Sequence, residues 1–170
     1  MSEPDHHGKR VESVACAVIT VSDTRTPDTD KSGAMIRERL ASAGHRVVSY
    51  DILPDEPSQV RDRVVTLCSD ASCQAVLLTG GTGLAPRDTT YEAITAILEK
   101  QLDGFGELFR MLSYQEVGPA AMLSRATAGT CNSTLVFSMP GSTAAVGLAM
   151  DKLILPQIGH LAWLLEKVSG

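Results

Sequence analysis

Short apolar runs alternate with stretches of helical spacing along the first half of this chain. The runs at 14–21, 46–53 and 75–79 are rich in β-branched and aliphatic residues, which predicts three buried strands. Apolar positions three and four residues apart recur after each run and predict an amphipathic helix there. The predicted helices cover about 30–43, a stretch up to 69, and a stretch from 89 towards 103.

The second half repeats this alternation less regularly. The expected elements are a helix at 105–117, a short segment at 120–126, a strand at 134–139, a helix at 143–155 and a last helix to about 167. Gly118 and Pro119 break the first of these helices, and Pro156 marks the end of the second. Strands that alternate with helices predict an α/β fold with a mostly parallel sheet, right-handed crossovers and helices on both faces.

Composition indicates one domain. The chain has 170 residues, of which 44% are hydrophobic and 21% charged, and no low-complexity linker divides it. We expect a polar, disordered tail at 1–12 and one folded domain at 13–170. No apolar stretch reaches the roughly 18 residues of a membrane span, and the polar start lacks a secretory signal. Four cysteines without a CxxC pair fit a reducing interior, so we expect a cytoplasmic protein.

Charge and aromatic content argue against nucleic acid as a partner. The net charge is -5, which gives no general attraction to polyanions. One Trp, three Tyr and three Phe are spread singly and form no run on which bases stack. We therefore expect no nucleic-acid partner.

A glycine-rich loop follows the strand at 75–79. It reads Thr79-Gly80-Gly81-Thr82-Gly83 and precedes a stretch of helical spacing. Glycines let backbone N–H groups approach an anion, and a helix N-terminus adds a positive dipole, so the loop fits phosphate. The loop matches neither GxGxxG nor GxxxxGK[ST], however, and a purely structural turn is an equal alternative.

Two aspartates at strand ends are candidates for chemistry, because ligands bind beyond the carboxyl ends of a parallel sheet. Asp88, which follows Arg87, either caps the next helix or holds Mg²⁺ against phosphates. Asp55 stands between two prolines and poses the same choice. Thr89 and Glu92 have the spacing of a capping box.

Other polar residues have weaker signals. Ser22 and Asp23 follow the first strand and offer hydrogen-bonding groups, although a solvated turn has the same composition. Arg110 and Arg125 are candidates for recognising phosphate or carboxylate, because a planar guanidinium can grip two oxygens at once. No zinc-ligand motif or hydrolytic triad spacing is present, so those chemistries have little support.

Four segments form a set with a specific order and spacing. They are 79–88 (TGGTGLAPRD), 104–110 (GFGELFR), 123–126 (LSRA) and 139–142 (MPGS). Together they resemble the MoaB/MogA family of molybdenum cofactor biosynthesis proteins. The resemblance runs from about residue 14 to 161, and the run at 104–117 is most similar to the MoaB branch.

The resemblance implies a fold, an assembly and an activity. The fold is a single three-layer α/β/α domain that binds molybdopterin and forms a homotrimer, sometimes a dimer of trimers. The implied enzyme is a molybdopterin adenylyltransferase, in which the terminal phosphate of molybdopterin attacks the α-phosphate of Mg-ATP and pyrophosphate leaves. The adenylylated product then passes to a MoeA-type molybdenum insertase.

The resemblance also implies site residues. Asp55 and Asp88 match the family's two important aspartates, and Gly80, Gly81 and Gly83 match the segment that contacts phosphate. The matches to the pocket walls are Ser113, Ser124, Arg125, Pro140, Gly141 and Ser142. Loop position and arginine chemistry, rather than the resemblance, add five further candidates to this set: Ser22, Asp23, Thr79, Thr82 and Arg110.

Three points stay open at this stage. Tyr91 stands where many members have a proline, and it either replaces that proline on the surface or narrows the pocket mouth. A non-catalytic molybdopterin-binding or assembly protein of the same fold is the main alternative to the enzyme. A nicotinamide-dependent oxidoreductase has weak support, because the loop at 22–26 after the first strand contains no glycine.

Overall fold

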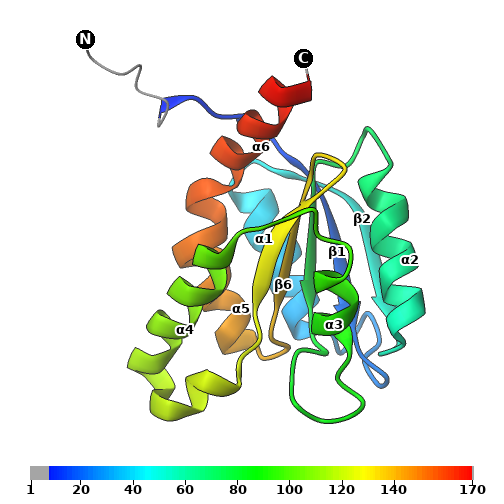
Figure 1. The fold of residues 1–170 in the computed structure, drawn as a ribbon, viewed down its shortest axis with the longest axis vertical. Helices are drawn as coiled ribbons and strands as arrows, with labels where there is room; N and C mark the ends of the chain where they lie inside the picture. Colours follow the sequence, from blue (N-terminus) through cyan, green and yellow to red (C-terminus); the bar gives the residue numbers. More distant parts are fainter. Residues whose placement is uncertain (1–7, 170) are drawn as a thin grey trace.

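A six-stranded sheet in the order β2-β1-β3-β6-β5-β4 forms the centre of the described chain (Figure 1). The structure is a computed structural model, and it describes residues 8–169. The strands β1, β2, β3 and β6 run parallel, and β5 is antiparallel to both β6 and β4. Their bounds are β1 (Ala15–Val21), β2 (Arg46–Leu53), β3 (Ala75–Thr79), β4 (Lys100–Gln101), β5 (Thr127–Cys131) and β6 (Thr134–Met139).

Helices cover both faces of the sheet, as predicted for a three-layer fold. One core packs α1, α4, α5 and α6 against the sheet, and a second core packs α2 and α3 against the opposite face. The strands β1, β3 and β6 lie between these two cores, which explains why every residue of each strand is buried. The helix bounds are α1 (Lys31–Ser42), α2 (Pro57–Cys68), α3 (Thr90–Thr95), α4 (Asp103–Val117), α5 (Thr143–Ala149) and α6 (Leu155–Ser169).

The hairpin of β5 and β6 and the edge strand β4 were not expected from the sequence. Gly129 shows the reason: a Cβ at this position would lie 2.2 Å from the Lys100 carbonyl oxygen, so β4 and β5 pair around a residue without a side chain. With a glycine at its centre and only small residues, β5 has a weak strand signal in the sequence. The predicted segment at 120–126 is largely a 3-10 turn, Gly118–Leu123, which leads into β5.

Pro156 does not end a helix, contrary to the expectation. A π turn at Met150–Ile154 joins α5 to α6, so the helical path continues through the proline. In this wider turn the Leu155 amide donates to the Met150 carbonyl, five residues back. Pro156 then lies at the second position of α6, directly after the wider turn, where the ring is accommodated although its residue cannot donate a backbone hydrogen bond.

The chain before β1 contacts α6. The Val11 amide donates to the Gly159 carbonyl at 3.0 Å, and His160 Nδ1 lies 2.9 Å from the Lys9 carbonyl oxygen. The disordered tail expected at 1–12 did not include these contacts. Residues 1–7 of that tail lie outside the described residues. Within residues 8–169, no helix has the length and apolar character to cross a membrane.

Asp30 ties three elements together beneath the carboxyl edge of the sheet. Its carboxylate accepts hydrogen bonds from Thr20 Oγ1 at 2.6 Å, Tyr50 OH at 2.5 Å and the Gly33 amide at 2.9 Å. Burial alone acts to raise the pKa of Asp30, but these three donors outweigh it, and the pKa lies below its ordinary value. The carboxylate therefore fixes the ends of β1 and β2 against the start of α1.

We predict that Asp30→Ala lowers the free energy of unfolding by about 2–4 kcal/mol, because three donors lose their acceptor. Chemical denaturation measures this, and Asp28→Ala, in the exposed part of the same loop, is the matched control. Since the pKa is lowered on folding, the stabilisation is complete above the ordinary pKa of aspartate and is lost as the pH falls through the folded value. The difference between wild type and variant should therefore shrink below about pH 4. A difference independent of pH would contradict this account.

Candidate functional site

Four loops meet where the parallel strands end, at the lower edge of Figure 1. They begin at Ser22 after β1, Pro54 after β2, Gly80 after β3 and Pro140 after β6. In the sheet, β2 lies on one side of β1, and β3, which follows β2 in the chain, lies on the other side of β1. The strand order therefore reverses beside β1. This is the position at which open parallel sheets bind ligands.

The glycine loop is shaped by contacts that exclude side chains. Gly80 has φ +98°, and a Cβ there would lie 2.3 Å from the Val21 carbonyl oxygen. Gly81 has φ +69°, and its Cβ would lie 2.0 Å from Thr90 Oγ1 and 2.8 Å from Asp55 Oδ2. These positions therefore accept glycine alone without strain.

The same loop presents unpaired backbone donors. Within the described chain, the amides of Gly81, Thr82, Gly83 and Leu84 donate to no protein acceptor, whereas the neighbouring Gly80 amide donates to the Met139 carbonyl at 3.0 Å. Successive free N–H groups in a turn form an anion-binding concavity. The loop can therefore hold phosphate without a lysine.

Asp55 is buried beneath this loop rather than capping α2. Its backbone amide donates to Asp23 Oδ1 at 3.0 Å, and its own Oδ1 accepts from the Thr89 amide at 3.2 Å and from Thr89 Oγ1 at 2.9 Å. Asp55 Oδ2 faces Gly81. Nearby, the buried Thr90 Oγ1 has no hydrogen-bond partner among the described residues. One carboxylate oxygen thus anchors the start of α3 and the other remains available.

Asp88 lies on the loop itself. A Cβ at Gly83 would lie 2.7 Å from Asp88 Oδ2, so this carboxylate packs directly on the glycine backbone. Its backbone amide donates to the Ala85 carbonyl, while its side chain makes no hydrogen bond within residues 8–169. The predicted capping box is absent, because Thr89 bonds Asp55 and Glu92 pairs with Arg125 instead. Asp88 is the unpaired carboxylate of the loop.

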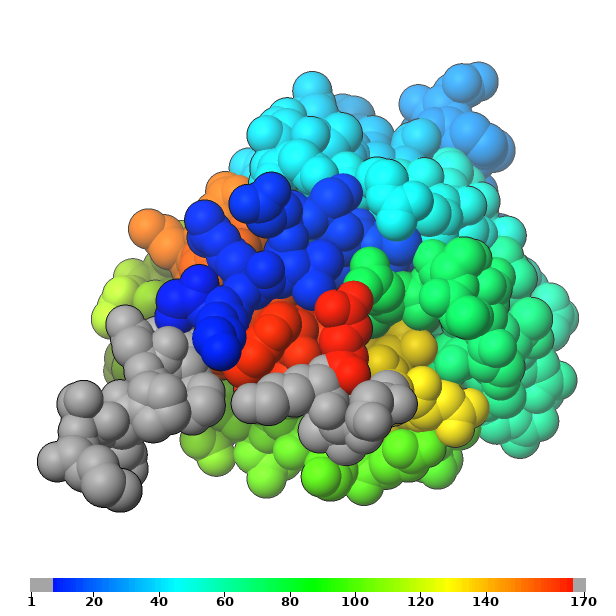
Figure 2. Space-filling model, turned by 90° about the horizontal axis from the view of Figure 1, so that it is seen from above, coloured from blue at the N-terminus to red at the C-terminus, as the bar shows by residue number. Residues whose placement is uncertain are grey.

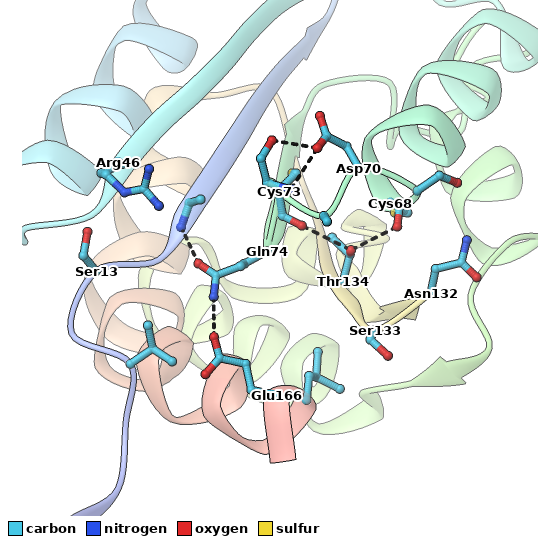
Figure 3. A pocket seen from close by; sticks show the side chains of 16 residues that line it. Ser13, Arg46, Cys68, Asp70, Cys73, Gln74, Asn132, Ser133, Thr134 and Glu166 are labelled. Carbon is cyan, nitrogen blue, oxygen red and sulfur yellow. Dashed lines mark hydrogen bonds between the residues drawn. The ribbon is translucent and has the colours of Figure 1, made fainter. Parts of the chain in front are cut away.

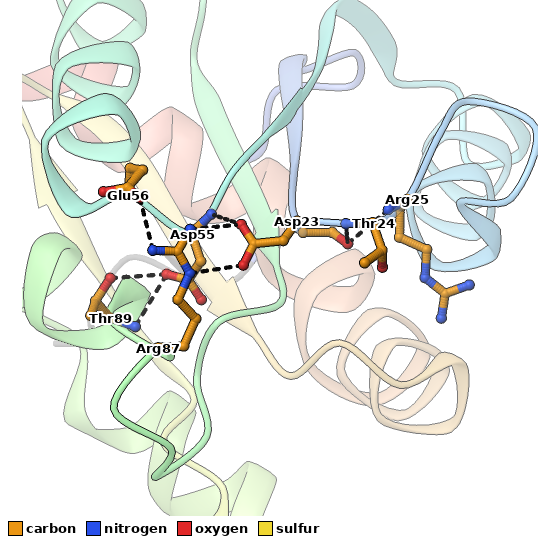
Figure 4. A network of polar contacts seen from close by, with 8 residues as sticks. Asp23, Thr24, Arg25, Asp55, Glu56, Arg87 and Thr89 are labelled. Atoms are coloured by element: carbon orange, nitrogen blue, oxygen red, sulfur yellow. Dashed lines mark hydrogen bonds and ion pairs between the residues drawn. The ribbon is translucent and has the colours of Figure 1, made fainter.

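Asp23, Arg87 and Glu56 form an ion-pair network across the mouth of the site (Figure 4). Arg87 Nε donates to Asp23 Oδ2 at 2.8 Å, and Arg87 Nη1 donates to Glu56 Oε1 at 2.8 Å. The Arg87 hydrogen bonds, followed by the bond from the Asp55 amide, lower the pKa of Asp23 to about 2. Asp23 is therefore committed to this network.

A cavity of about 310 Å³ lies on the other side of Gly80. Its wall residues include Ser22, Asp30, Ser32, Thr79 and Ser142. Two bonds hold the loop after β6 against it: Thr79 Oγ1 donates to the Pro140 carbonyl at 2.8 Å, and Ser32 Oγ donates to the Gly141 carbonyl at 2.7 Å. The cavity is hydroxyl-rich, and Asp30 forms part of its wall.

Not every predicted residue joins these groups. Arg110 donates to the Ser124 and Ala126 carbonyls at 3.5 and 3.4 Å and lines a separate cavity of about 160 Å³. Ser113 lies half-buried on α4 without a hydrogen bond to the other described site residues. Ser124 Oγ is buried and unpaired in the described chain. Arg125 reaches the glycine loop, but through carbonyl oxygens.

A larger hollow, about 1030 Å³, lies at the opposite edge of the sheet (Figure 3). Figure 2 views this edge and shows the segment leading into β1 beside α6. Several polar side chains of the hollow are engaged within the protein: Gln74 accepts from the Ala15 amide and donates to Glu166, and Asp70 accepts from Ser72. The geometry therefore favours the smaller site at the carboxyl edge.

Sequence reasoning missed several residues that build the site. Asp30, Tyr50 and Glu56 were not selected, and Glu92 was assigned only to a cap. Asp30 had a usable signal, because an aspartate before the first turn of a helix is a typical N-cap, and its Oδ1 accepts from the Gly33 amide. Tyr50 and Glu56 carry no local signal, since their partners lie on other elements.

The comparisons with known proteins identify the family of this chain. Residues 17–160 match a family model described as "Probable molybdopterin binding domain". The molybdenum cofactor biosynthesis protein B of Halalkalibacterium halodurans is 52% identical over 162 residues, which cover 95% of each chain. A crystal structure of a molybdenum cofactor biosynthesis protein B superposes with TM-score 0.89 at 50% identity and covers 91% of this chain and 97% of that one. The tungsten cofactor synthesizing protein MoaB from Pyrococcus furiosus gives TM-score 0.79 at 36% identity, covering 92% and 97%.

We predict that Gly81→Ala lowers the free energy of unfolding by about 1–3 kcal/mol, because alanine is strained at positive φ and meets Thr90 and Asp55. Gly104→Ala is the control: its Cβ meets nothing within 4 Å in the first turn of α4, so stability should stay equal or rise by up to about 1 kcal/mol. Thermal and chemical denaturation compare the two. Equal behaviour of both variants would show that the loop at Gly81 is not close-packed.

Proposed function

Because this chain belongs to the MoaB/MogA family of molybdenum cofactor biosynthesis proteins, we propose that it adenylylates molybdopterin with Mg-ATP. A role in molybdenum cofactor biosynthesis follows from the family. The observation that carries the finer proposal is the glycine loop with its free amides next to two carboxylates, Asp55 and Asp88. Pyrophosphate is the second product.

The chain's own residues would perform binding and alignment. In this reaction a terminal phosphate oxygen of molybdopterin bonds to the α-phosphorus of ATP, and the bond to the pyrophosphate oxygen breaks. The amides of Gly81 to Leu84 donate to phosphate oxygens where negative charge accumulates. The packed glycines keep these donors in place before the substrates arrive, which lowers the entropy lost in aligning two anions. No covalent intermediate on the protein is required.

The donor set fits Mg²⁺. Mg²⁺ prefers hard oxygen ligands and is commonly held by one or two carboxylates together with substrate phosphates. Asp88 and Asp55 Oδ2 would hold it, and the unpaired Thr90 Oγ1 beside Gly81 supports a polar occupant there. No group of three His, Cys, Asp or Glu residues converges in residues 8–169, so phosphates must complete such a site. When bound, the ion neutralises charge between the phosphates.

The cavity behind Gly80 supports the pterin end of the substrate. Its volume of about 310 Å³ suits a small bicyclic ring; the hydroxyls of Ser22 and Ser142 can donate, and that of Ser32 can accept. The Asp30 carboxylate in its wall can accept a ring N–H. The Gly80-Gly81 backbone would then separate the pterin from the nucleotide.

We also propose the domain, the compartment and the downstream protein of this reaction. The molybdopterin-binding domain would span 13–170, act in the cytoplasm, and pass its product to a MoeA-type molybdenum insertase. A non-catalytic molybdopterin-binding or assembly protein is the alternative. It has the same loop and cavity but makes no product.

Turnover distinguishes the two functions. We predict that wild type with molybdopterin and Mg-ATP releases pyrophosphate and forms adenylylated pterin. The rate of product formation should be at least about 100-fold lower in Asp88→Asn. Asp62→Asn, an exposed position on α2, is the control and should keep the full rate. Titration of molybdopterin binding should be similar in all three proteins. Pterin binding without product in wild type would establish the non-catalytic alternative.

We further propose a homotrimer or a dimer of trimers. The support is a set of exposed apolar side chains on α4 and the turn after it, which we call the α4 surface: Leu108, Met111, Tyr114, Val117, Met122 and Leu123. Each is between 47% and 76% exposed, and a contiguous apolar surface of this kind is typical of an interface.

Light scattering after size-exclusion chromatography tests the assembly. Wild type should have the mass of three or six chains of 18.1 kDa, and Met111→Glu should shift it to one chain, because a charge would be buried at the interface. Val65→Glu places the same change on α2, outside the α4 surface, and should leave the mass unchanged. A monomeric wild type would refute the proposed assembly.

A further inference from the structure

Arg125 reaches from the segment before β5 across to the glycine loop. Its Nε donates to the Thr82 carbonyl at 3.0 Å, and its Nη2 donates to the Gly83 carbonyl at 2.5 Å and to the Asp88 carbonyl at 3.4 Å. Nη1 forms an ion pair with Glu92 on α3. One side chain thus joins both ends of the loop to the following helix.

These contacts consume the side chain's hydrogen-bonding capacity. A guanidinium carries five N–H donors, and the carbonyls and the Glu92 carboxylate occupy most of them. The side chain is 21% exposed. The sequence suggests Arg125 as a ligand of phosphate, but its donors point at protein oxygens.

The carbonyl contacts determine where the loop's amides point. In a trans peptide the C=O and the following N–H point in opposite directions. Arg125 draws the Thr82 and Gly83 carbonyls towards itself, so the amides of Gly83 and Leu84 must point to the other side. Both amides lack a protein acceptor in the described structure. The arginine therefore orients the free donors without touching their ligand.

Tyr91 and Glu92 hold the guanidinium in this position. The Arg125 guanidinium carbon lies 4.9 Å from the centre of the Tyr91 ring, a cation–π contact. Glu92 follows on the same helix and supplies the ion pair. Tyr91 thus supports Arg125, and it also lines the cavity of about 160 Å³ beside Arg110.

We propose that Arg125 is a positioning residue that holds the glycine loop in its phosphate-binding shape, supported by Tyr91 and Glu92. Its consequence for catalysis rests on the adenylyltransfer proposed above, whereas its effect on the free loop does not. A lysine cannot replace it, because one ammonium cannot reach three carbonyls with the geometry of a planar fork.

The first arm of the test uses ligand-free protein. The amides of Asp88 and Thr90 are hydrogen-bonded to Ala85 and Gly81, so their hydrogen exchange, followed by NMR, reports closure of the loop. We expect about 10-fold or faster exchange at both in Arg125→Lys. Arg61→Lys, an exposed arginine paired with its neighbour on α2, is the control and should match wild type. Unchanged exchange in Arg125→Lys overturns the proposal.

The second arm measures Mg-ATP binding by calorimetry. We expect Arg125→Lys to bind about 10-fold more weakly, Tyr91→Ala to weaken binding less, and Tyr91→Phe, which keeps the ring, to match wild type. At saturating Mg-ATP, kcat of Arg125→Lys should recover more than kcat/KM, because the ligand itself can reorder the loop. Faster exchange with unchanged affinity overturns the proposal. Failure of wild type to make product, with the exchange result intact, refutes the adenylyltransfer and leaves Arg125 as the residue that holds the loop.

Discussion

The close approach of the Gly80-Gly81 backbone to its neighbours is the constraint on which the site depends. Parallel pairing of β1 with β3 brings Val21 against Gly80, and the turn that follows brings Gly81 against Thr90 and Asp55. No side chain fits between them, so the ends of β1 and β3 and the start of α3 are fixed relative to one another. The carboxylate of Asp55 and the free amides of the loop acquire their positions from this contact, and a cavity remains on one side and an open loop on the other.

Charge at this edge is arranged differently from a simple basic pocket. Asp23 and Glu56 neutralise the charge of Arg87, and Glu92 neutralises the charge of Arg125. The arginines nearest the loop are therefore ion-paired within the protein. At the glycine loop, positive potential for a bound anion comes instead from backbone amides. Since these are partial charges, phosphates held here keep much of their mutual repulsion. A bound divalent cation therefore complements the site, and unpaired carboxylate oxygens are the appropriate protein groups to hold it.

The sequence predicted the parts of the structure that local patterns determine. Buried parallel strands and amphipathic helices have strong periodic signals, so the three-layer fold was predicted correctly. Two of the three main misses depend on a partner distant in sequence, and the third depends on the turn that precedes it. Gly129 forms a strand because β4 approaches it closely, Pro156 is accommodated by a preceding π turn, and Thr89 bonds Asp55 rather than its own helix. Residue chemistry alone suggested that Arg125 binds phosphate, yet its three carbonyl partners are visible only in the folded chain.

The role of Arg125 outside the phosphate contacts shows how the loop would bind its ligand. A loop that binds anions through its backbone has no side chain to optimise, so its affinity depends on conformational entropy lost on binding. Residues outside the loop must therefore supply the order: Asp55 at the start of α3, Arg125 at the carbonyls, and glycines where a Cβ would interfere. In the proposed reaction these residues act before any substrate binds. Substitutions at Arg125 should then resemble a weaker phosphate site in binding experiments, although the side chain contacts no phosphate.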